Sequence, residues 1–347
     1  MRGLRAGPIL ALTAAILFGL SAPAAKILLG SVDPWLLAGL LYLGSGAGLS
    51  IYRLARGTTG EPSLGSRDAP WMGGAIVAGG VIGPVLLMFA LARGPASQSA
   101  LLLNLEGVLT AAVAWVVFRE AFHARIVVGM LAITAGAVVL TWNGSVGLAV
   151  DASALLVAGA CLAWAVDNNL TRVVSAADPV QIAALKGIAA GSVNIVVAIA
   201  RGASWPGLAS VAGASLVGLL GYGTSLVLFI RALRHVGTSR TGAYFATAPF
   251  IGALAAVVAL GEAPTTALLV AAAFMGLGVW LHLTEDHDHE HVHAPLAHEH
   301  AHRHDEHHQH EHPDGVPMRE PHAHWHTHAP MRHRHPHYPD LHHRHPH

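Results

Sequence analysis

Ten apolar runs, each about 20 residues long, limit what this chain can fold into. A helix needs about 20 apolar residues to cross the hydrocarbon core of a bilayer. The segments between the runs are short and carry turn signals such as Asp33-Pro34 and Asp178-Pro179. The sequence therefore predicts an all-α membrane protein with ten transmembrane helices. The runs lie at about 8–29, 35–54, 71–92, 99–118, 124–142, 150–172, 180–200, 207–231, 239–260 and 265–283.

The basic residues of these runs and their loops favour one orientation in the membrane. If the N-terminus is cytoplasmic, eleven Arg residues fall at the inner ends of the spans, against Lys26, Arg93 and Arg201 at the outer ends. Cytoplasmic loops carry an excess of Lys and Arg. The N-terminal apolar run lacks an Ala-x-Ala-like cleavage site and is expected to be a first span. We therefore expect a multi-pass protein of the cell inner membrane with both termini in the cytoplasm.

The two halves of this body repeat each other. Gly107 precedes Glu120 by 13 residues, and Pro249 precedes Glu262 by the same 13 residues. The beginning of each half also matches, with residues 17–26 parallel to residues 163–172. Because each half holds an odd number of spans, five, the two halves lie in opposite orientations. Inverted repeats with a substrate site near the bilayer midplane are typical of secondary transporters that work by alternating access. The predicted repeats are residues 1–142 and 143–283.

The body resembles the EamA branch of the drug/metabolite transporter superfamily over about residues 8–283. The resemblance lies in a small-residue turn, a Glu/Gly or Ala/Pro pair and a terminal Glu, once in each half. It implies ten helices in two five-helix repeats and secondary transport, often export, of small organic solutes. The chain departs from the family pattern twice: Gly107 replaces a Pro in the first half, and Ala248 replaces a Glu in the second. The two halves have therefore specialised.

Two strong polar residues, Asn104 and Glu106, interrupt the fourth apolar run. Glu106 lies seven residues into this run, roughly 10 Å from its outer end at 1.5 Å per residue. Ionisable residues inside a span are costly and usually functional. We expect Glu106 to bind substrate or a proton; the alternative is a structural carboxyl bonded to a neighbouring helix. Asn104 is a candidate substrate-binding residue beside it.

A second polar group interrupts the sixth run at Asp167, Asn168 and Asn169. Asp167 and Lys186 are expected at matching depth in adjacent antiparallel spans, as a counter-charge for substrate or as a structural ion pair. Adjacent helix residues diverge by about 100°, so Asn168 and Asn169 are not both expected to face a cavity. One is expected to bond across to another helix. Tyr244 is a further candidate for the pathway, although aromatic residues in spans more often pack or anchor the helix.

The remaining segment, residues 284–347, has a different composition. It holds 23 of the 26 His residues and 11 of the 20 acidic residues of the chain. Such a segment cannot bury a core and is expected to be disordered without a ligand. Neutral imidazole suits Ni, Co, Zn and Cu, so the tail is predicted to bind a divalent transition metal. The first candidate ligands are His287, His289, His291, His293, His298, His300, His302, His304, His307, His308, His310 and His312.

Three functions are compatible with this combination. The first is a transporter, expected to export a small metabolite, whose tail senses or buffers metal. The second is a divalent metal (Ni, Co or Zn) exporter whose tail collects the cation, although the predicted spans hold no His or Cys cluster. The third is a non-transporting metal sensor or store, against which the repeated body argues. No nucleophile motif or phosphate loop indicates an enzyme. We expect no cofactor for transport and no nucleic-acid partner; a homodimer stays open.

Overall fold

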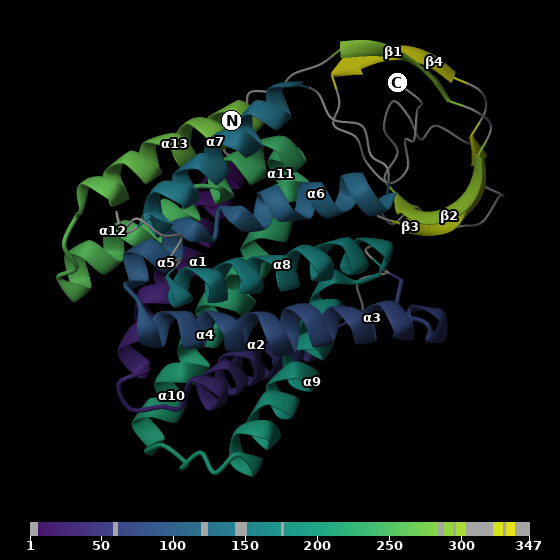
Figure 1. Ribbon diagram of the computed structural model, residues 1–347. Helices are drawn as coiled ribbons and strands as arrows, with labels where there is room; N and C mark the ends of the chain where they lie inside the picture. The colour runs from purple at the N-terminus through teal and green to yellow at the C-terminus, as the bar shows by residue number, and fades with distance from the viewer. Residues whose placement is uncertain are drawn as a thin grey trace.

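The computed structural model describes residues 6–57, 62–118, 124–142, 151–174 and 177–283, and the backbone of four strands between 288 and 336. Side chains of residues 6, 233–240 and 243 lie outside the described part. The body is helical (Figure 1). Its first repeat contains α1 (Ala6–Leu28), α2 (Pro34–Arg56), η2 (Ser66–Asp68), α3 (Ala69–Ala75), η3 (Ile76–Ile82), α4 (Gly83–Arg93), α5 (Ala96–Leu102), α6 (Leu105–Phe118) and α7 (Ala124–Thr141). The second contains α8 (Ala152–Val173), α9 (Pro179–Ala200), α10 (Leu208–Val217), η4 (Gly218–Thr224), α11 (Ser225–Phe245), α12 (Ala248–Leu260) and α13 (Thr266–Leu283).

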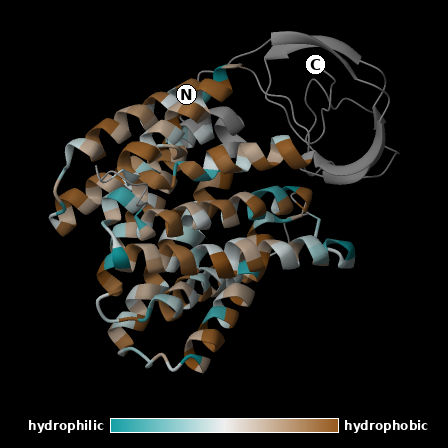
Figure 2. Cartoon of the chain, viewed as in Figure 1, coloured by the Kyte–Doolittle hydropathy of each residue, from teal (hydrophilic) through white to brown (hydrophobic). Residues whose placement is uncertain are grey.

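The expected all-α membrane architecture is confirmed. Among the described residues, nine helical segments are long and apolar enough to cross a membrane, and α12 is a tenth, shorter apolar helix. Many large apolar side chains are exposed on the outside of the bundle, and the helices of the body are coloured largely brown, for hydrophobic residues, in Figure 2. Leu54 and Val258, for example, are 83% and 75% exposed. A surface of this kind is suited to lipid, because a protein surrounded by water rarely exposes apolar patches of such extent.

Two of the turn signals act as helix caps. The side chain of Asp33 accepts hydrogen bonds from the N–H groups of Trp35 and Leu36, and Pro34 begins α2. Asp178 caps α9 in the same way, followed by Pro179. Proline suits the first helical position because its missing N–H is not needed there.

One predicted boundary is wrong. A turn was expected between residues 231 and 239, but α11 continues unbroken to Phe245. The corresponding segment of the first repeat contains Gly94 and Pro95 and breaks there, whereas the second repeat has Gly237 without a proline. The break at Ala246 and Thr247 in the second repeat corresponds to the break at Leu103 and Asn104 in the first.

Helices pack in an arrangement that follows the repeat. The helices α2 and α9 pair closely, and so do α7 and α13, which lie side by side in Figure 1. The remaining contacts come in matched sets: α1 packs on α12 as α8 packs on α6, and α1 packs on η4 and α11 as α8 packs on η3 and α4. Glycines permit the closest approaches. A Cβ built on Gly187 would meet the Cα of Gly46 at 2.6 Å.

Two π-helical segments, η3 and η4, occupy equivalent places in the two repeats. They begin at Ile76 and Gly218, which are 142 positions apart, as are Gly107 and Pro249. A π-helix bonds each N–H to the carbonyl five residues back, and it often marks a functional region.

The tail contains two antiparallel strand pairs. The strand β1 (Asp288–His293) pairs with β4 (Met331–Pro336), placing His291 opposite His333. The strand β2 (Leu296–His302) pairs with β3 (His322–His328). The side chains of these residues lie outside the described part, so both the predicted disorder and the predicted metal ligands of the tail stay predictions.

Candidate functional site

The fourth span is broken between α5 and α6, and the break positions Glu106. The N–H groups of Leu103 and Asn104 donate to carbonyls three residues back, which ends the α-helical ladder. The side chain of Asn104 donates to the carbonyl of Leu101 at 2.9 Å and so satisfies an acceptor at the end of α5. Glu106 lies in the first turn of α6. The partial positive charge at the N-terminus of a helix favours a carboxylate there.

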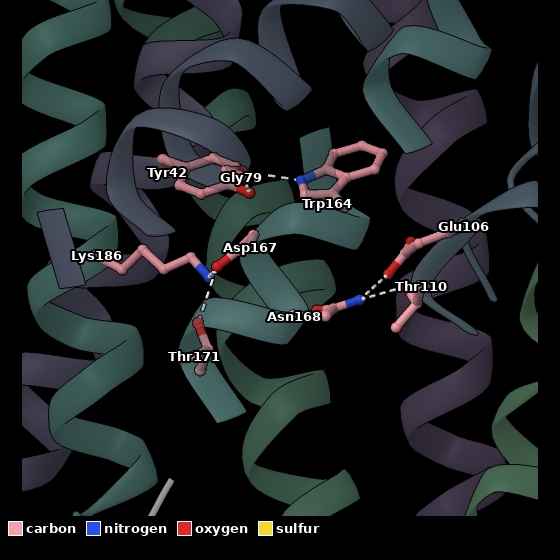
Figure 3. Close-up of polar contacts among 9 residues, drawn as sticks. All are labelled: Tyr42, Gly79, Glu106, Thr110, Trp164, Asp167, Asn168, Thr171 and Lys186. Carbon is pink, nitrogen blue, oxygen red and sulfur yellow. Dashed lines mark hydrogen bonds and ion pairs between the residues drawn. The ribbon is translucent and has the colours of Figure 1, made fainter. Parts of the chain in front are cut away.

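Asn168 of α8 connects Glu106 to the opposite helix (Figure 3). Its Nδ2 donates to Oε1 of Glu106 at 2.9 Å and lies 3.3 Å from Oγ1 of Thr110. Glu106 and Thr110 are four residues apart, so they lie on one face of α6. Asn168 is exposed and Glu106 half-buried, so this polar group is accessible from a space between the helices.

Asn169 also bonds to α6, and both asparagines line the cavity, contrary to the expectation that they would not both face one. Its Nδ2 donates to the carbonyl of Thr110 at 3.2 Å and to the carbonyl of Ala165 at 2.8 Å. The two side chains do diverge, since Asn169 is buried and Asn168 is exposed. Both nevertheless line the same cavity. The reason is that α6 runs alongside α8 and offers Asn168 a hydroxyl and Asn169 a backbone carbonyl.

A cavity of about 370 Å³ lies between α6 and α8 at this point. Small residues on α6, at one-turn spacing, leave it open: a Cβ built on Gly107 would meet nothing within 4 Å. The cavity has a carboxylate near one end and the guanidinium-bearing Arg172 near the end of α8. Its lining residues are Glu106, Gly107, Thr110, Ala111, Ala114, Asn168, Asn169 and Arg172.

Asp167 and Lys186 form the expected ion pair on another face of α8 (Figure 3). The Nζ of Lys186 lies 2.6 Å from Oδ1 of Asp167, and Thr171 donates to the same oxygen at 2.9 Å. The Asp167 side chain is 5% exposed and that of Lys186 is 18% exposed. Neither residue lines the α6–α8 cavity. In this conformation the pair joins α8 to α9, as the structural interpretation requires.

Donors from three helices bond to the carbonyls of η3. The hydroxyl of Tyr42 and the indole N–H of Trp164 donate to Gly79 O at 2.8 and 2.9 Å. The amide of Asn194 donates to Gly80 O at 3.2 Å. Gly79 also permits Asp167 to approach, because a Cβ there would lie 1.8 Å from its Oδ2. The π-segment therefore connects α2, α8 and α9 beside the ion pair.

Besides Asp167 and Lys186, two further predicted residues do not line the cavity. Asn104 is buried and bonds within its own turn, with Met275 Sδ as a distant second acceptor at 3.9 Å. Tyr244 is half-buried near the end of α11, and it does not line the α6–α8 cavity. Among the described residues, no group of three His, Cys, Asp or Glu side chains could hold a metal ion.

Thr110 is the site residue that the sequence analysis missed. It touches both asparagines, yet threonine is common in spans and carries no charge. Its spacing of four residues from Glu106 is the signal that could have identified it. The π-segments were also missed, although Gly79-Gly80 and Gly221-Tyr222-Gly223 lie at matching places in the two halves.

An inverted pair of five-helix repeats, a broken span in each and a polar cavity between helices define a multi-pass membrane transporter. Comparison with known proteins agrees. The EamA-like transporter family matches residues 5–142 and 152–284, and the chain belongs to this family. Each match covers one of the two repeats.

Two relatives illustrate the relationship. An uncharacterized transporter of Methanothermobacter thermautotrophicus strain Delta H is 27% identical over 274 residues, covering 74% of this chain and 80% of the relative. A crystal structure of a protein that is 22% identical superposes with a TM-score of 0.59 and covers 80% of this chain and 98% of the other. This second likeness supports the fold alone.

Proposed function

We propose that the chain is a secondary transporter that exports a small metabolite through the α6–α8 cavity by alternating access. The observation that carries this proposal is the polar group formed by Glu106, Asn168 and Thr110, which lines a cavity between the middle of the fourth span and the last turns of α8. Polar groups at such a depth are costly unless they serve a pathway. A substrate entering the cavity exchanges hydrogen bonds with Asn168, because that side chain is exposed.

The direction and topology belong to the same proposal. The excess of Arg at one end of the spans favours cytoplasmic termini. In that orientation Arg172, at the end of α8, marks the cytoplasmic end of the cavity. The cavity then opens toward the cytoplasm, which is the loading side for export.

The tail is proposed to bind a divalent transition metal through its His residues. Imidazoles at alternating positions, as in His287, His289, His291 and His293, suit Ni, Co, Zn or Cu. A cytoplasmic tail of this kind connects transport to the metal supply of the cell. The alternative, export of the metal itself, is an outcome of the test, because no described residue cluster of the body favours it.

The test compares the metabolites released by cells that express the native chain with those released by cells that express Glu106→Gln. Loss of the carboxylate should reduce release of the exported solute at least tenfold while the protein stays in the membrane. Asp68→Asn is the matched control, because Asp68 is half-buried like Glu106, lies outside the cavity and accepts a hydrogen bond from Gly65 N. Equal release from native and Glu106→Gln cells would remove this cavity from the pathway.

A second measurement separates the metal hypotheses. Proteoliposomes with the full chain and with residues 284–347 deleted are assayed for Ni²⁺, Co²⁺ and Zn²⁺ flux and for metal binding. Binding that is lost with the tail, without flux in either form, supports the metabolite carrier. Metal flux that survives the deletion but not Glu106→Gln would make the chain a metal exporter.

A further inference from the structure

The short helix α5 closes the bundle on the opposite side of Glu106 from the cavity. Six of its seven residues are buried, and it packs mainly on α12 with smaller contacts to α1 and α8. The cavity extends from Glu106 along α6 and α8 toward Arg172, away from α5. A solute that leaves the cavity toward the other end of the bundle must therefore pass α5.

Two charged side chains form hydrogen bonds to the backbone on either side of the break that precedes α5. The carboxylate of Glu262, in the loop after α12, accepts hydrogen bonds from Ala96 N at 2.7 Å and from Ser97 N at 2.8 Å. The Nζ of Lys26, at the end of α1, donates to the carbonyls of Gly94, at 3.0 Å, and Leu91. A negative group thus lies at a helix N-terminus and a positive group at a helix C-terminus, the favourable arrangement at both.

The surrounding backbone places these side chains. Gly261 ends α12 with a φ of 70°, a left-handed conformation that glycine adopts without strain, and the chain then turns so that Glu262 reaches α5. Gly94 lies against the start of α8, where a Cβ would meet Ser153 Oγ at 2.3 Å. Both repeats therefore converge on the break at Gly94 and Pro95.

The equivalent segment at the other end of the bundle is different. Val236 and Gly237 correspond to Gly94 and Pro95 by the 142-residue offset, and α11 runs through them without a break. One end of the bundle thus has a broken, capped helix, and the other has a continuous one. Alternating access requires the two ends to differ in accessibility whenever one of them is open, and a difference in helix structure between the ends is one way to produce this.

We infer that Lys26 and Glu262 form the outer gate contact of the transporter, and that release of Glu262 from the N-terminus of α5 opens the pathway on that side. This inference rests on the proposed function. We call the contact between these two side chains and the backbone of Leu91, Gly94, Ala96 and Ser97 the α5 clasp. With the clasp formed, Ser97 is buried.

Thiol labelling tests the clasp without knowledge of the substrate. Cys161 is the single cysteine of the chain, so Cys161→Ser gives a cysteine-free background in which the hydroxyl can replace the thiol as donor to Leu102 O. Ser97→Cys is added, and a membrane-impermeant thiol reagent is applied from outside. Glu262→Gln should increase the labelling rate at least fivefold, because a neutral amide loses the charge-assisted bonds.

Asp33→Asn is the matched control. Asp33 also caps a helix N-terminus at this end through two N–H groups, those of Trp35 and Leu36, but its helix is α2. Labelling of Ser97→Cys should not change in this control. A labelling rate that is equal in the native, Glu262→Gln and Asp33→Asn backgrounds would overturn the inference.

A crosslink covers the case in which Glu262→Gln does not fold. In the same background, Ser97→Cys and Ala263→Cys, which leave the Glu262 carboxylate in place, are joined by a short, reversible bifunctional thiol reagent. Export should stop in the crosslinked protein and return on reduction. Export that continues at the uncrosslinked rate would refute the gate. If labelling responds to Glu262→Gln while no solute is exported by the native chain, the clasp stands and the proposed function fails.

Discussion

The α6–α8 contact and its symmetry mate, the α12–α1 contact, have the same architecture and opposite character. The first holds a polar cavity of about 370 Å³. In the second, α1 and α12 meet backbone to backbone: a Cβ on Gly19 would lie 2.5 Å from Ala248 O, and a Cβ on Gly252 would lie 2.7 Å from Gly19 O. The residues at matching positions explain the difference, because Glu106 and Thr110 correspond to Ala248 and Gly252.

The difference between these two helix contacts explains how an inverted repeat can have a single polar site. Duplication supplies two equal helix contacts, and substitution makes one polar and the other close-packed. The close-packed contact fixes the position of α1 on α12, while the polar contact leaves room for a solute. In the proposed function, one of these contacts binds the solute and its repeat-related counterpart stabilises the bundle.

The largest expected effect comes from adding the same side chain to both contacts. Gly252→Leu forces a side chain between two backbones and should lower the free energy of unfolding by about 3 kcal/mol or more. Gly107→Leu enters the cavity and should change it by less than about 1 kcal/mol, while solute release falls at least tenfold. Thermal unfolding in detergent and the release assay measure the two effects. Equal losses of stability in both variants would end the distinction between the contacts.

A smaller expected loss of stability distinguishes the Asp167–Lys186 ion pair from the cavity. Asp167→Asn leaves Lys186 charged in a site where it is 18% exposed, and losing one partner of a buried pair typically costs about 3 kcal/mol. Adding Lys186→Met should restore part of this stability, because no unpaired charge remains. Glu106→Gln should reduce the free energy of unfolding by less, because the hydrogen-bond partner of Glu106 is the neutral amide of Asn168 and no charge is left unpaired. The check is a double-mutant cycle of unfolding free energies; additive losses would show that the pair is not coupled.

The smallest effect concerns a residue outside both contacts. Burial disfavours ionisation of Asp178, but hydrogen bonds from Arg56 and from Val180 N, with the charge of Arg56, lower its pKa below the ordinary 3.8. The unfolded chain therefore binds this proton more readily than the folded one. The resulting stability is present above pH 3.8 and is lost as the pH falls through the lowered pKa.

Asp178→Asn should therefore reduce stability at pH 7, and the difference from the native chain should disappear in acid. Unfolding midpoints from pH 7 to pH 3 measure this, and solute release at pH 7 should stay within twofold of native. If the difference in unfolding midpoint between the native chain and Asp178→Asn stayed constant down to pH 3, the lowered pKa of Asp178 would not be the cause of the stabilisation. Asp178→Asn thus serves as a reference variant, because it shows how much stability the protein can lose while solute release stays near the native level.

Periodicity and charge in the sequence were sufficient for the helices, the repeat and the pairing of Asp167 with Lys186. These features depend on hydrophobic length and on opposite charges in neighbouring spans, which single residues reveal. The site needed the structure. Whether Asn168 or Asn169 is exposed, and that Thr110 receives both, depends on how α6 lies against α8. The rotation of α6 and α8 about their own axes is determined by packing over the whole bundle.

The unbroken α11 was not predicted for a related reason. Gly237 is permissive for a helix or a turn, and tertiary packing decides between them. Pro95, by contrast, cannot donate an N–H and favours a break wherever it stands. The sequence therefore predicted the break at Gly94 and Pro95 more securely than the structure at the equivalent Val236 and Gly237.

The two π-segments have a consequence for the history of the chain. Each residue of a helix turns the chain by about 100°, so one extra residue rotates everything that follows by about that angle. A new insertion in one repeat would have misdirected the apolar face of the helix behind it. Yet η3 and η4 begin at Ile76 and Gly218, the same distance apart as Gly107 and Pro249. This matching position is the one that a single insertion in a five-helix ancestor would leave in both copies after its gene was duplicated.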